Sequence, residues 1–422
     1  MEIEQCRPRW SSSMTTPNVI LLVIDSLRAD VTYGSEASTP NIDSFRAHGV
    51  TFTQCVSTTT TTTPSFASML SGTYPPKHGV RGLQGYRLST AVPTIAEQFV
   101  AGGYHTYAEV TGPLLPQTDV LRGFTELTHR QGYKVPFFGW RDDVVAKMKN
   151  YLEPWLMLLH IWEVHRPFRS PPDFEKTWDR AGYHAALTAT DEWLGPVFEQ
   201  VGDDALVVIT GDHGEEYPDN GWQQLKVRVS RKVRRGLRPA GWFPFLDRKL
   251  GARVVGHGFG LQEALVRVPL VIAGAGHPGT TMTDQVRHVD LLPTLGELLG
   301  LSVPSHIDGR SLVPLIEGKS LPEEPAYMEA VGEKLGGKRI AGARTPDWKL
   351  LRYGSGRCEL FRIGGDGPPD EKRNLYARYP EVGRRLESFV DEVSSTESAA
   401  EAPMTDEEEA IVEQHLRDLG YL

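Results

Sequence analysis

Two apolar segments, each ending in acidic residues, limit what this chain can fold into. The first, "NVILLVID", ends at Asp25, and the second, "ALVVITGDHG" (Ala205–Gly214), carries Asp212 and His213 directly after its apolar run. Continuous apolar runs rich in β-branched residues are typical of strands that are buried on both faces of a parallel sheet. "VPLVIAG" (Val268–Gly274) predicts a third strand of the same kind.

Helical patterns lie between and after these strands. The sequence predicts helices over Pro40–His48 and Thr94–Ala101, and "DLLPTLGELLGL" (Asp290–Leu301) predicts an amphipathic helix with a proline near its start. Strands that alternate with helices predict an α/β sheet covered on both faces. Ligands of such sheets bind beyond the carboxyl ends of the strands, which is where Asp25 and Asp212 are expected.

The pattern changes in the last quarter of the chain. "RIAGARTPDWKLLRYGSGRCELFRI" predicts a small antiparallel meander, and "SSTESAAEAPMTDEEE" a flexible linker before a helix at about Thr405–Leu422. We therefore divide the chain into an N-terminal extension (1–16), a main α/β domain (17–325) and a C-terminal α+β subdomain with its tail (326–422).

Charge and cysteine content exclude several classes of protein. The net charge of −9 argues against a nucleic-acid-binding domain, which is usually basic. The three cysteines, Cys6, Cys55 and Cys358, are far apart and form no CxxC pair, so neither a disulfide framework nor a structural zinc site is expected. The N-terminus lacks the apolar region of a secretory signal, and the longest apolar run is too short to span a bilayer. We expect a cytoplasmic protein.

The strand-end residues have the chemistry of a metal site. Hard divalent cations bind carboxylate oxygens, so Asp25 and the Asp212-His213 pair are candidate ligands if the two strand ends meet. A single carboxylate at a strand end is more often a cap or turn residue. The "GDHGE" segment is more specific, because a glycine on each side of the pair permits a tight turn that presents both side chains together.

A run of six threonines lies in "STTTTTTPSF" (Ser57–Phe66). Taken alone, the run fits either a low-complexity linker or a loop in which one hydroxyl is reactive. A threonine just before a helix can also serve only as its N-cap.

The order of motifs along the chain resembles the sulfatase family of the alkaline phosphatase superfamily. The blocks that carry the resemblance span most of residues 17–385: "NVILLVIDSLRAD", "TPSFASMLSGTYPPKHGV", "LLHIWEVHRPF", "TGDHGE", "GHGFGLQEALVRVPLVI", "HVDLLPTLGELLGL" and "IDGRSLVPLIEG". The resemblance implies an alkaline-phosphatase-like three-layer α/β fold with a mainly parallel mixed sheet. It places Thr62 at the nucleophile position of the family's Cys/Ser-x-Pro-Ser-Arg motif, with Thr61 and Thr63 as the alternatives.

Departures from the family motif point toward phosphorus chemistry. A threonine cannot become formylglycine by the family's route, and threonine at this position is found in relatives that act on phosphate esters. Phe66 replaces the motif arginine, and the Tyr107–Leu115 segment lacks the family's lysine and histidine. We expect cleavage of phosphate esters, with phosphodiesters favoured, through a covalent ester on Thr62 that water or an acceptor alcohol resolves.

The resemblance also implies one divalent metal ion and a proton donor. Ser26 replaces the second aspartate of the family's pair, so the ligands implied are Asp25, Thr62, Asp212 and His213. Mn²⁺ is favoured over Ca²⁺ and Mg²⁺ because one ligand is an imidazole. The candidate proton donors to the leaving oxygen are His257 and His165, which can alternatively be packed loop histidines. His78 and His160 are expected to be structural.

A basic insertion separates two of these blocks. Residues 218–255 are rich in lysine and arginine, and Leu225, Val229, Val233 and Leu237 recur every four residues. Residues 225–246 therefore predict peripheral contact with an anionic membrane, at its inner face, or guidance of a polyanionic substrate. A solvated helix or an oligomer contact is the alternative.

Two other functions fit the sequence less well. One is a sulfuric ester hydrolase, a sulfatase, that uses an unmodified threonine. The other is a non-catalytic binder of an anionic glycan or lipid, which the intact set of Asp25, Thr62, Asp212 and His213 argues against. The sequence does not identify the anionic ester, whether glycan, lipid headgroup or small molecule, and it indicates no oligomeric state.

Overall fold

The computed structural model describes most of the chain. The described residues are 16–130, 137–166, 168, 182–217, 257–274, 279–332, 338–364, 369–396 and 404–419. The predicted basic insertion, with its membrane-contact segment 225–246, lies outside them, as do the N-terminal extension up to residue 15 and residues 397–403 of the predicted linker. Within the described parts of the chain, no helix combines the length and apolarity that a membrane crossing requires.

Eight strands form the main sheet, in the order β4-β3-β5-β1-β6-β7-β2-β8. Their bounds are β1 Val19–Ile24, β2 Gly49–Val56, β3 His105–Val110, β4 Glu126–His129, β5 Trp155–Ile161, β6 Leu206–Gly211, β7 Arg267–Ala273 and β8 Thr280–Arg287. The two segments that end in Asp25 and Asp212 are the buried parallel strands β1 and β6, as predicted.

One strand runs against the others. β7 pairs antiparallel with both β2 and β6, whereas every other neighbouring pair in the sheet is parallel. The prediction that Val268–Gly274 is a third parallel strand is therefore wrong in direction. The reason is that a continuous apolar run reports burial on both faces of a sheet, and β7 is buried whichever way it runs.

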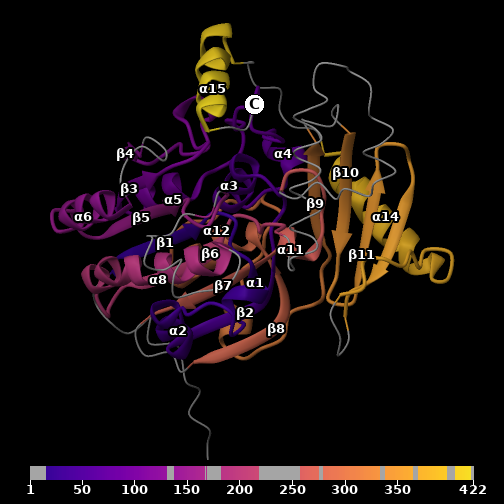
Figure 1. The fold of residues 1–422 in the computed structure, drawn as a ribbon, viewed down its shortest axis with the longest axis horizontal. Helices are drawn as coiled ribbons and strands as arrows, with labels where there is room; N and C mark the ends of the chain where they lie inside the picture. Colours follow the sequence, from indigo (N-terminus) through magenta and orange to yellow (C-terminus); the bar gives the residue numbers. More distant parts are fainter. Residues whose placement is uncertain are drawn as a thin grey trace, which may run out of the picture.

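Helices cover both faces of this sheet and make a three-layer α/β arrangement, as predicted (Figure 1). The bounds are α1 Ala29–Thr32, α2 Pro40–Ala47, α3 Thr62–Ser71, α4 Pro75–His78, α5 Ile95–Ala101, α6 Phe137–Met148, α8 Gly182–Val201, α11 Glu263–Val266, α12 Leu291–Leu299 and α13 Val313–Ile316, with 3₁₀ turns η2 Pro116–Thr118 and η5 His288–Asp290. Side chains of β1 alternate between two cores, because successive residues of a strand point to opposite faces. One core contains α3, α5, α12 and α13, and the other α1, α2, α6 and α8.

The predicted helices have local causes in the sequence. Thr94 caps α5 reciprocally with Glu97: the Glu97 amide donates to the Thr94 hydroxyl at 3.2 Å and the Thr94 amide to Glu97 Oε2 at 2.9 Å. α12 ends at Gly300, which adopts a φ of +66° that favours glycine.

A second, smaller sheet follows the main one. Its strands are β9 Ala326–Gly332, β10 Lys338–Arg344, β11 Trp348–Tyr353 and β12 Cys358–Arg362, and all its pairs are antiparallel, which confirms the predicted meander. α14 (Pro380–Ser394), which the sequence did not predict, packs on this sheet. α15 (Asp406–Leu419) lies apart from α14, over the main domain (Figure 1). There, Val412 and Leu416 pack on Leu83 and Leu115.

Buried ion pairs join the small sheet to the main domain. Glu263, in α11, lies 2.9 Å from Nη2 of Arg344 and 3.0 Å from Nζ of Lys349. Burial alone would raise the pKa of the Glu263 carboxyl, but Lys349 and Arg344 outweigh burial and hold it below its ordinary value. A backbone contact also joins the two parts: the amide of Glu329 in β9 donates to the carbonyl of Thr58 at 2.8 Å, so the threonine run is bonded directly to the second sheet.

Candidate active site

The candidate metal ligands meet at the carboxyl ends of two adjacent strands. β1 and β6 pair in register with Ile24 opposite Gly211, so the next residues, Asp25 and Asp212, leave the sheet side by side. Ligand atoms of Asp25, Asp212 and His213 all lie within 4.8 Å of one another, and all three side chains are buried. The strand ends therefore converge as the metal-site prediction requires.

Ser26 links the two carboxylates. Its backbone amide donates to Oδ1 of Asp212 at 3.0 Å, and its hydroxyl donates to Oδ1 of Asp25 at 2.8 Å. Its φ of +64° is a left-handed conformation that non-glycine residues rarely adopt, and the hydroxyl of Tyr183 holds it by donating to the Ser26 carbonyl at 2.8 Å. Residues with a strained backbone conformation of this kind are frequent at functional sites. Ser26, at the position of the family's second aspartate, thus donates one hydrogen bond to each of the two carboxylates.

The threonine run is an ordered, buried loop that leads into α3. Thr62 is the first residue of α3, and its hydroxyl donates to Oδ2 of Asp25 at 3.2 Å. The hydroxyl of Thr63 instead donates to the carbonyl of Pro113, also at 3.2 Å. Thr61 occupies the N-cap position of α3, but its side chain makes no capping hydrogen bond. Among the three candidate threonines, Thr62 is the one whose hydroxyl contacts a candidate metal ligand.

The charges in the cluster of Asp25, Asp212 and His213 favour a bound cation. Burial and the neighbouring Asp212 raise the pKa of Asp25 well above its ordinary value, whereas His213 and His160 overcome the effect of burial and lower the pKa of Asp212. Oδ2 of Asp212 and Nε2 of His213 lie 3.5 Å apart, and both are buried without a hydrogen-bond partner among the described residues. Unpaired buried polar atoms are costly. A divalent cation would satisfy both atoms, so these residues fit the metal site that the sequence implies.

His160 is a residue of this site that the sequence analysis did not place there. It lies in β5, opposite Val23 of β1, with Nε2 3.7 Å from Oδ2 of Asp25. Its ring meets that of Phe66 edge-on at 5.0 Å between centroids, so it packs against the residue that replaces the motif arginine. The signal that could have found it is a histidine at the end of a continuous apolar strand.

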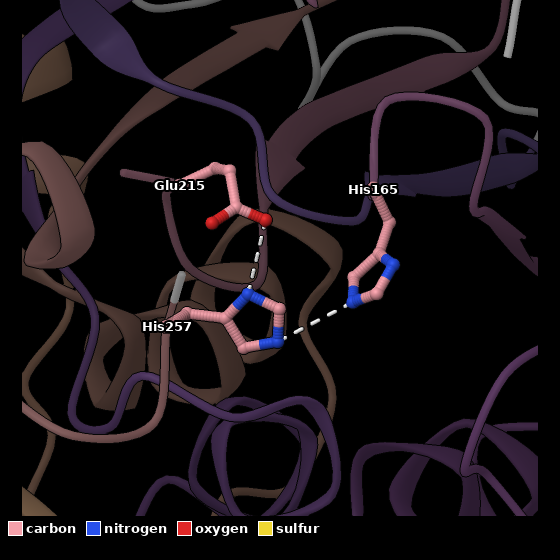
Figure 2. Close-up of side chains that lie close together, drawn as sticks. All are labelled: His165, Glu215 and His257. Carbon is pink, nitrogen blue, oxygen red and sulfur yellow. Dashed lines mark hydrogen bonds and ion pairs between the residues drawn. The ribbon is translucent and has the colours of Figure 1, made fainter. Parts of the chain in front are cut away.

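A second cluster lies beside the first and contains His165, Glu215 and His257 (Figure 2). Nδ1 of His257 is 3.1 Å from Oε2 of Glu215, and Nε2 of His257 is 3.3 Å from Nε2 of His165. The rings of His257 and His213 are 4.4 Å apart, so the two clusters adjoin. Both predicted proton donors are thus brought together. Glu215 was not predicted, although it stands two residues after His213 in "GDHGE".

Two arginines near the site, one buried and one half-buried, already lie beside acidic residues. Arg130 lies 2.5 Å from Glu163 in a fully buried ion pair and stacks over Trp140 at 4.6 Å. Arg166 Nε lies 3.8 Å from Oε1 of Glu215. The segment Tyr107–Leu115, which lacks the family's lysine and histidine, supplies the carbonyls of Thr111 and Pro113 to His160 and Thr63.

Comparisons with known proteins agree with the motif order. Residues 17–301 match the sulfatase family profile, and residues 259–395 match that of the C-terminal part of N-sulphoglucosamine sulphohydrolase. An ulvan-active sulfatase of Formosa agariphila is 25% identical over 382 residues, which cover 75% of this chain and 68% of that protein.

Solved structures show the same fold. A phosphonate monoester hydrolase from Silicibacter pomeroyi superposes with a TM-score of 0.71 at 20% identity, over 89% of this chain and 94% of that one. A putative sulfatase from Bacteroides thetaiotaomicron superposes with a TM-score of 0.69 at 19% identity, over 89% of this chain and 92% of that one.

Proposed function

Because the chain belongs to the sulfatase family, whose members are ester hydrolases that use divalent metal ions, we propose that it cleaves phosphate esters through a covalent ester on Thr62. Phosphodiesters are the favoured substrates. The observation that carries the proposal is the 3.2 Å hydrogen bond from the Thr62 hydroxyl to Asp25, inside a buried cluster suited to a cation.

The chain's own groups favour attack by Thr62. Its hydroxyl stands at the first turn of α3, a ten-residue helix whose first backbone N–H groups have no intrahelical acceptor. Such N–H groups bind phosphate oxygens and stabilise negative charge that develops there. A divalent cation held by Asp25, Thr62, Asp212 and His213, with Mn²⁺ favoured, would lower the pKa of the hydroxyl and neutralise the anionic ester.

In the proposed reaction, each bond that forms is matched by one that breaks, and the Thr62 proton has an acceptor. The Thr62 oxygen forms a bond to phosphorus while the bond from phosphorus to the leaving alcohol breaks, and the Thr62 proton leaves along its hydrogen bond to Asp25. Water, or an acceptor alcohol, then cleaves the Thr62 ester. We place the leaving oxygen on the side of His165 and His257, one of which would donate the proton that the leaving alcohol takes up.

Sulfate ester hydrolysis is the second candidate. It is favoured by the family profile and by the ulvan-active relative. Against it stands the chemistry of Thr62, since a sulfated threonine lacks the second hydroxyl by which a formylglycine hydrate expels sulfate. The ulvan-active relative also supports an anionic glycan as the alcohol part of the substrate. The cytoplasmic location and the membrane contact through 225–246 are further proposals, carried by sequence alone.

A panel of nitrophenyl esters tests the proposal. The purified protein is assayed with Mn²⁺ against the sulfate, the phosphate, a phosphodiester and a phosphonate ester. Thr63→Ala is the matched control for Thr62→Ala, because Thr63 is an adjacent buried threonine whose hydroxyl faces Pro113. Turnover of a phosphorus ester that is lost in Thr62→Ala and kept in Thr63→Ala is the expected result. Turnover of the sulfate alone would establish the second candidate.

A further inference from the structure

The helix α15 is not accounted for by the family resemblance. Both matched family profiles end before it, at residues 301 and 395, yet α15 lies over the main domain (Figure 1). Val412 and Leu416 bury their side chains in an apolar contact there, and Oε1 of Glu408 lies 2.5 Å from Nη2 of Arg87 in an ion pair. These contacts fix α15 to the main domain but do not reach the candidate active site.

A third contact, made by His415, does lead toward the site. Nε2 of His415 donates to the carbonyl oxygen of Gly112 at 2.9 Å, across 303 positions of the sequence. Nε2 of His129, at the end of β4, donates to the same oxygen at 3.0 Å, and the two imidazole rings meet edge-on at 5.2 Å between centroids. A carbonyl oxygen has two lone pairs and only accepts hydrogen bonds. The two histidines therefore occupy both lone pairs and hold this peptide group in one orientation.

Gly112 lies in the loop that follows β3, at the edge of the candidate active site. Its φ of +68° is a left-handed conformation that favours glycine. A methyl group added to Gly112 would lie 3.6 Å from Cε1 of His160, so the loop is in contact distance of that ring. The carbonyl of the preceding residue, Thr111, accepts from Nδ1 of His160 at 3.0 Å. The peptide group that His415 holds is thus the neighbour of the one that binds His160.

The loop sets the orientation of the His160 ring. The contact with Thr111 is the hydrogen bond that this ring makes among the described residues, because its Nε2 is buried without a partner. That Nε2 lies 3.7 Å from Oδ2 of Asp25, the oxygen to which Thr62 donates. Close-packed interiors transmit small displacements from one group to the next. A shift of the loop would therefore turn the His160 ring and move Asp25.

We propose that α15 positions the active site, with His415 as a positioning residue that acts on His160 through the carbonyl of Gly112. The inference rests on the proposed function, because it assigns α15 to the site that carries Thr62. His415 contacts none of the candidate metal ligands itself. Its contribution is to limit the motion of the loop, so that Asp25 keeps the place from which it binds the Thr62 hydroxyl.

Loss of His415 should loosen the loop without unfolding the protein. The carbonyl of Gly112 would keep its hydrogen bond from His129, and the hydroxyl of Thr63 would still donate to the next carbonyl of the loop at 3.2 Å. The fold would remain, and the placement of the reacting groups would become less exact. The competing explanation is that α15 only stabilises the fold, and kinetic constants separate the two.

Four full-length variants test the proposal. His415→Ala removes the donor to Gly112, whereas His415→Gln keeps an N–H donor near the position of Nε2. Val412→Asp places a charge in the apolar contact and should release α15 as a whole. Gln414→Ala is the matched control, because Gln414 precedes His415 in the same helix and its amide donates to Asp418 within α15. Thermal melts identify any variant that fails to fold.

Two readouts are taken from each variant. The first is kcat and KM on the phosphorus ester that the wild type turns over, and the second is hydrogen–deuterium exchange in the peptides of residues 107–115. His415→Ala should lower kcat by about 10- to 100-fold, the cost of a small misplacement of reacting groups, with KM nearly unchanged. Exchange in the loop should become faster. His415→Gln should recover most of kcat, and Gln414→Ala should match the wild type in both readouts.

The release of α15 should have the same effect as the loss of its histidine. Val412→Asp is expected to reproduce the kinetic loss of His415→Ala, and the double variant should be no worse than Val412→Asp alone, because both changes remove one contact. Additive losses would overturn the proposal, since they would mean that His415 acts without α15 being docked.

Unchanged exchange in His415→Ala would also overturn the proposal, as would faster exchange with an unchanged kcat, which would leave α15 a purely stabilising helix. Equal losses in His415→Ala and His415→Gln would show that the donated hydrogen bond is not what matters. Faster exchange in His415→Ala, in a protein whose wild type turns over no ester, would uphold the hold of α15 on the loop and defeat the proposed function.

Discussion

The hydroxyl of Thr62 donates a 3.2 Å hydrogen bond to Oδ2 of Asp25, across 37 positions of the sequence. This contact joins the first residue of α3 to the residue after β1. Because both groups are buried, the contact cannot be an incidental surface interaction. It connects a hydroxyl that can attack an ester to a carboxylate that can hold a cation.

Replacement of Thr62 should abolish turnover without unfolding the protein. Thr62→Ala removes the attacking oxygen, and loss of a nucleophile typically lowers kcat by on the order of 10⁴-fold or more. Thr62→Ser keeps the hydroxyl and should retain measurable activity. Mass spectrometry of acid-quenched reactions should find the phosphoryl group on the peptide that contains Thr62. A modified peptide in Thr62→Ala would assign the nucleophile elsewhere in the run.

Metal binding should stabilise the fold through Asp212. A ligand at about 100 times its Kd stabilises a folded protein by about 2.7 kcal/mol, so the Tm should fall with EDTA and recover with Mn²⁺. Asp212→Asn should reduce this increment. Asp191→Asn is the control: Asp191 is a buried carboxylate that accepts hydrogen bonds from Asn41 and Ile42, so its loss should lower the Tm yet leave the increment intact. An equal increment in both variants would contradict the assignment.

The left-handed conformation of Ser26 gives a paired prediction. Ser26→Gly and Ser26→Ala both lose the hydrogen bond from the Ser26 hydroxyl to Asp25. Only alanine keeps the cost of the φ of +64°, about 1–2 kcal/mol for a non-glycine residue. Chemical denaturation should therefore find Ser26→Gly the more stable of the two, with both variants less active than the wild type. Equal stabilities would show that the backbone relaxes.

His78 should make the protein sensitive to mild acid. Burial, with a smaller effect of Arg81, lowers the pKa of His78 from 6.5 to about 3. A group whose pKa is depressed by folding contributes stability that is present above its unfolded pKa and is lost as the pH falls through the folded value. The free energy of unfolding should decline from about pH 6.5 toward pH 3, and His78→Gln should flatten this slope. An unchanged slope would assign the acid sensitivity to the other buried histidines.

The part of the site that could be predicted from sequence is the part carried by local pattern. Asp25 and Asp212 end continuous apolar runs, and parallel strands bring such ends together, so their meeting follows from the strands alone. Thr62 was placed by the resemblance to the family's Cys/Ser-x-Pro-Ser-Arg motif, with Pro64 and Ser65 setting the register. The helices α2, α5 and α12 were predicted because their capping residues and prolines are local signals in the sequence.

The features that the sequence did not predict depend on contacts between segments that are distant in the chain. The direction of β7 is set by the order of strands in the sheet, which an apolar run does not encode. The sequence alone predicts a structural role for His160, because its nearness to Asp25 arises only when β5 pairs with β1. Glu215 gains its significance from His257, 42 residues later in the chain.

The hydrogen bond from the Glu329 amide to the Thr58 carbonyl and the buried ion pairs of Glu263 have a consequence for how the gene can be divided. The match to the sulfatase profile ends at residue 301, yet the loop that precedes Thr62 pairs with a strand beyond that point. A fragment cut at that point would expose the loop and leave Glu263 as a buried charge without its two counter-ions. The two sheets should therefore be exchanged between relatives only as one unit. A chimera that takes its main sheet from one relative and its second sheet from another is expected to fold poorly.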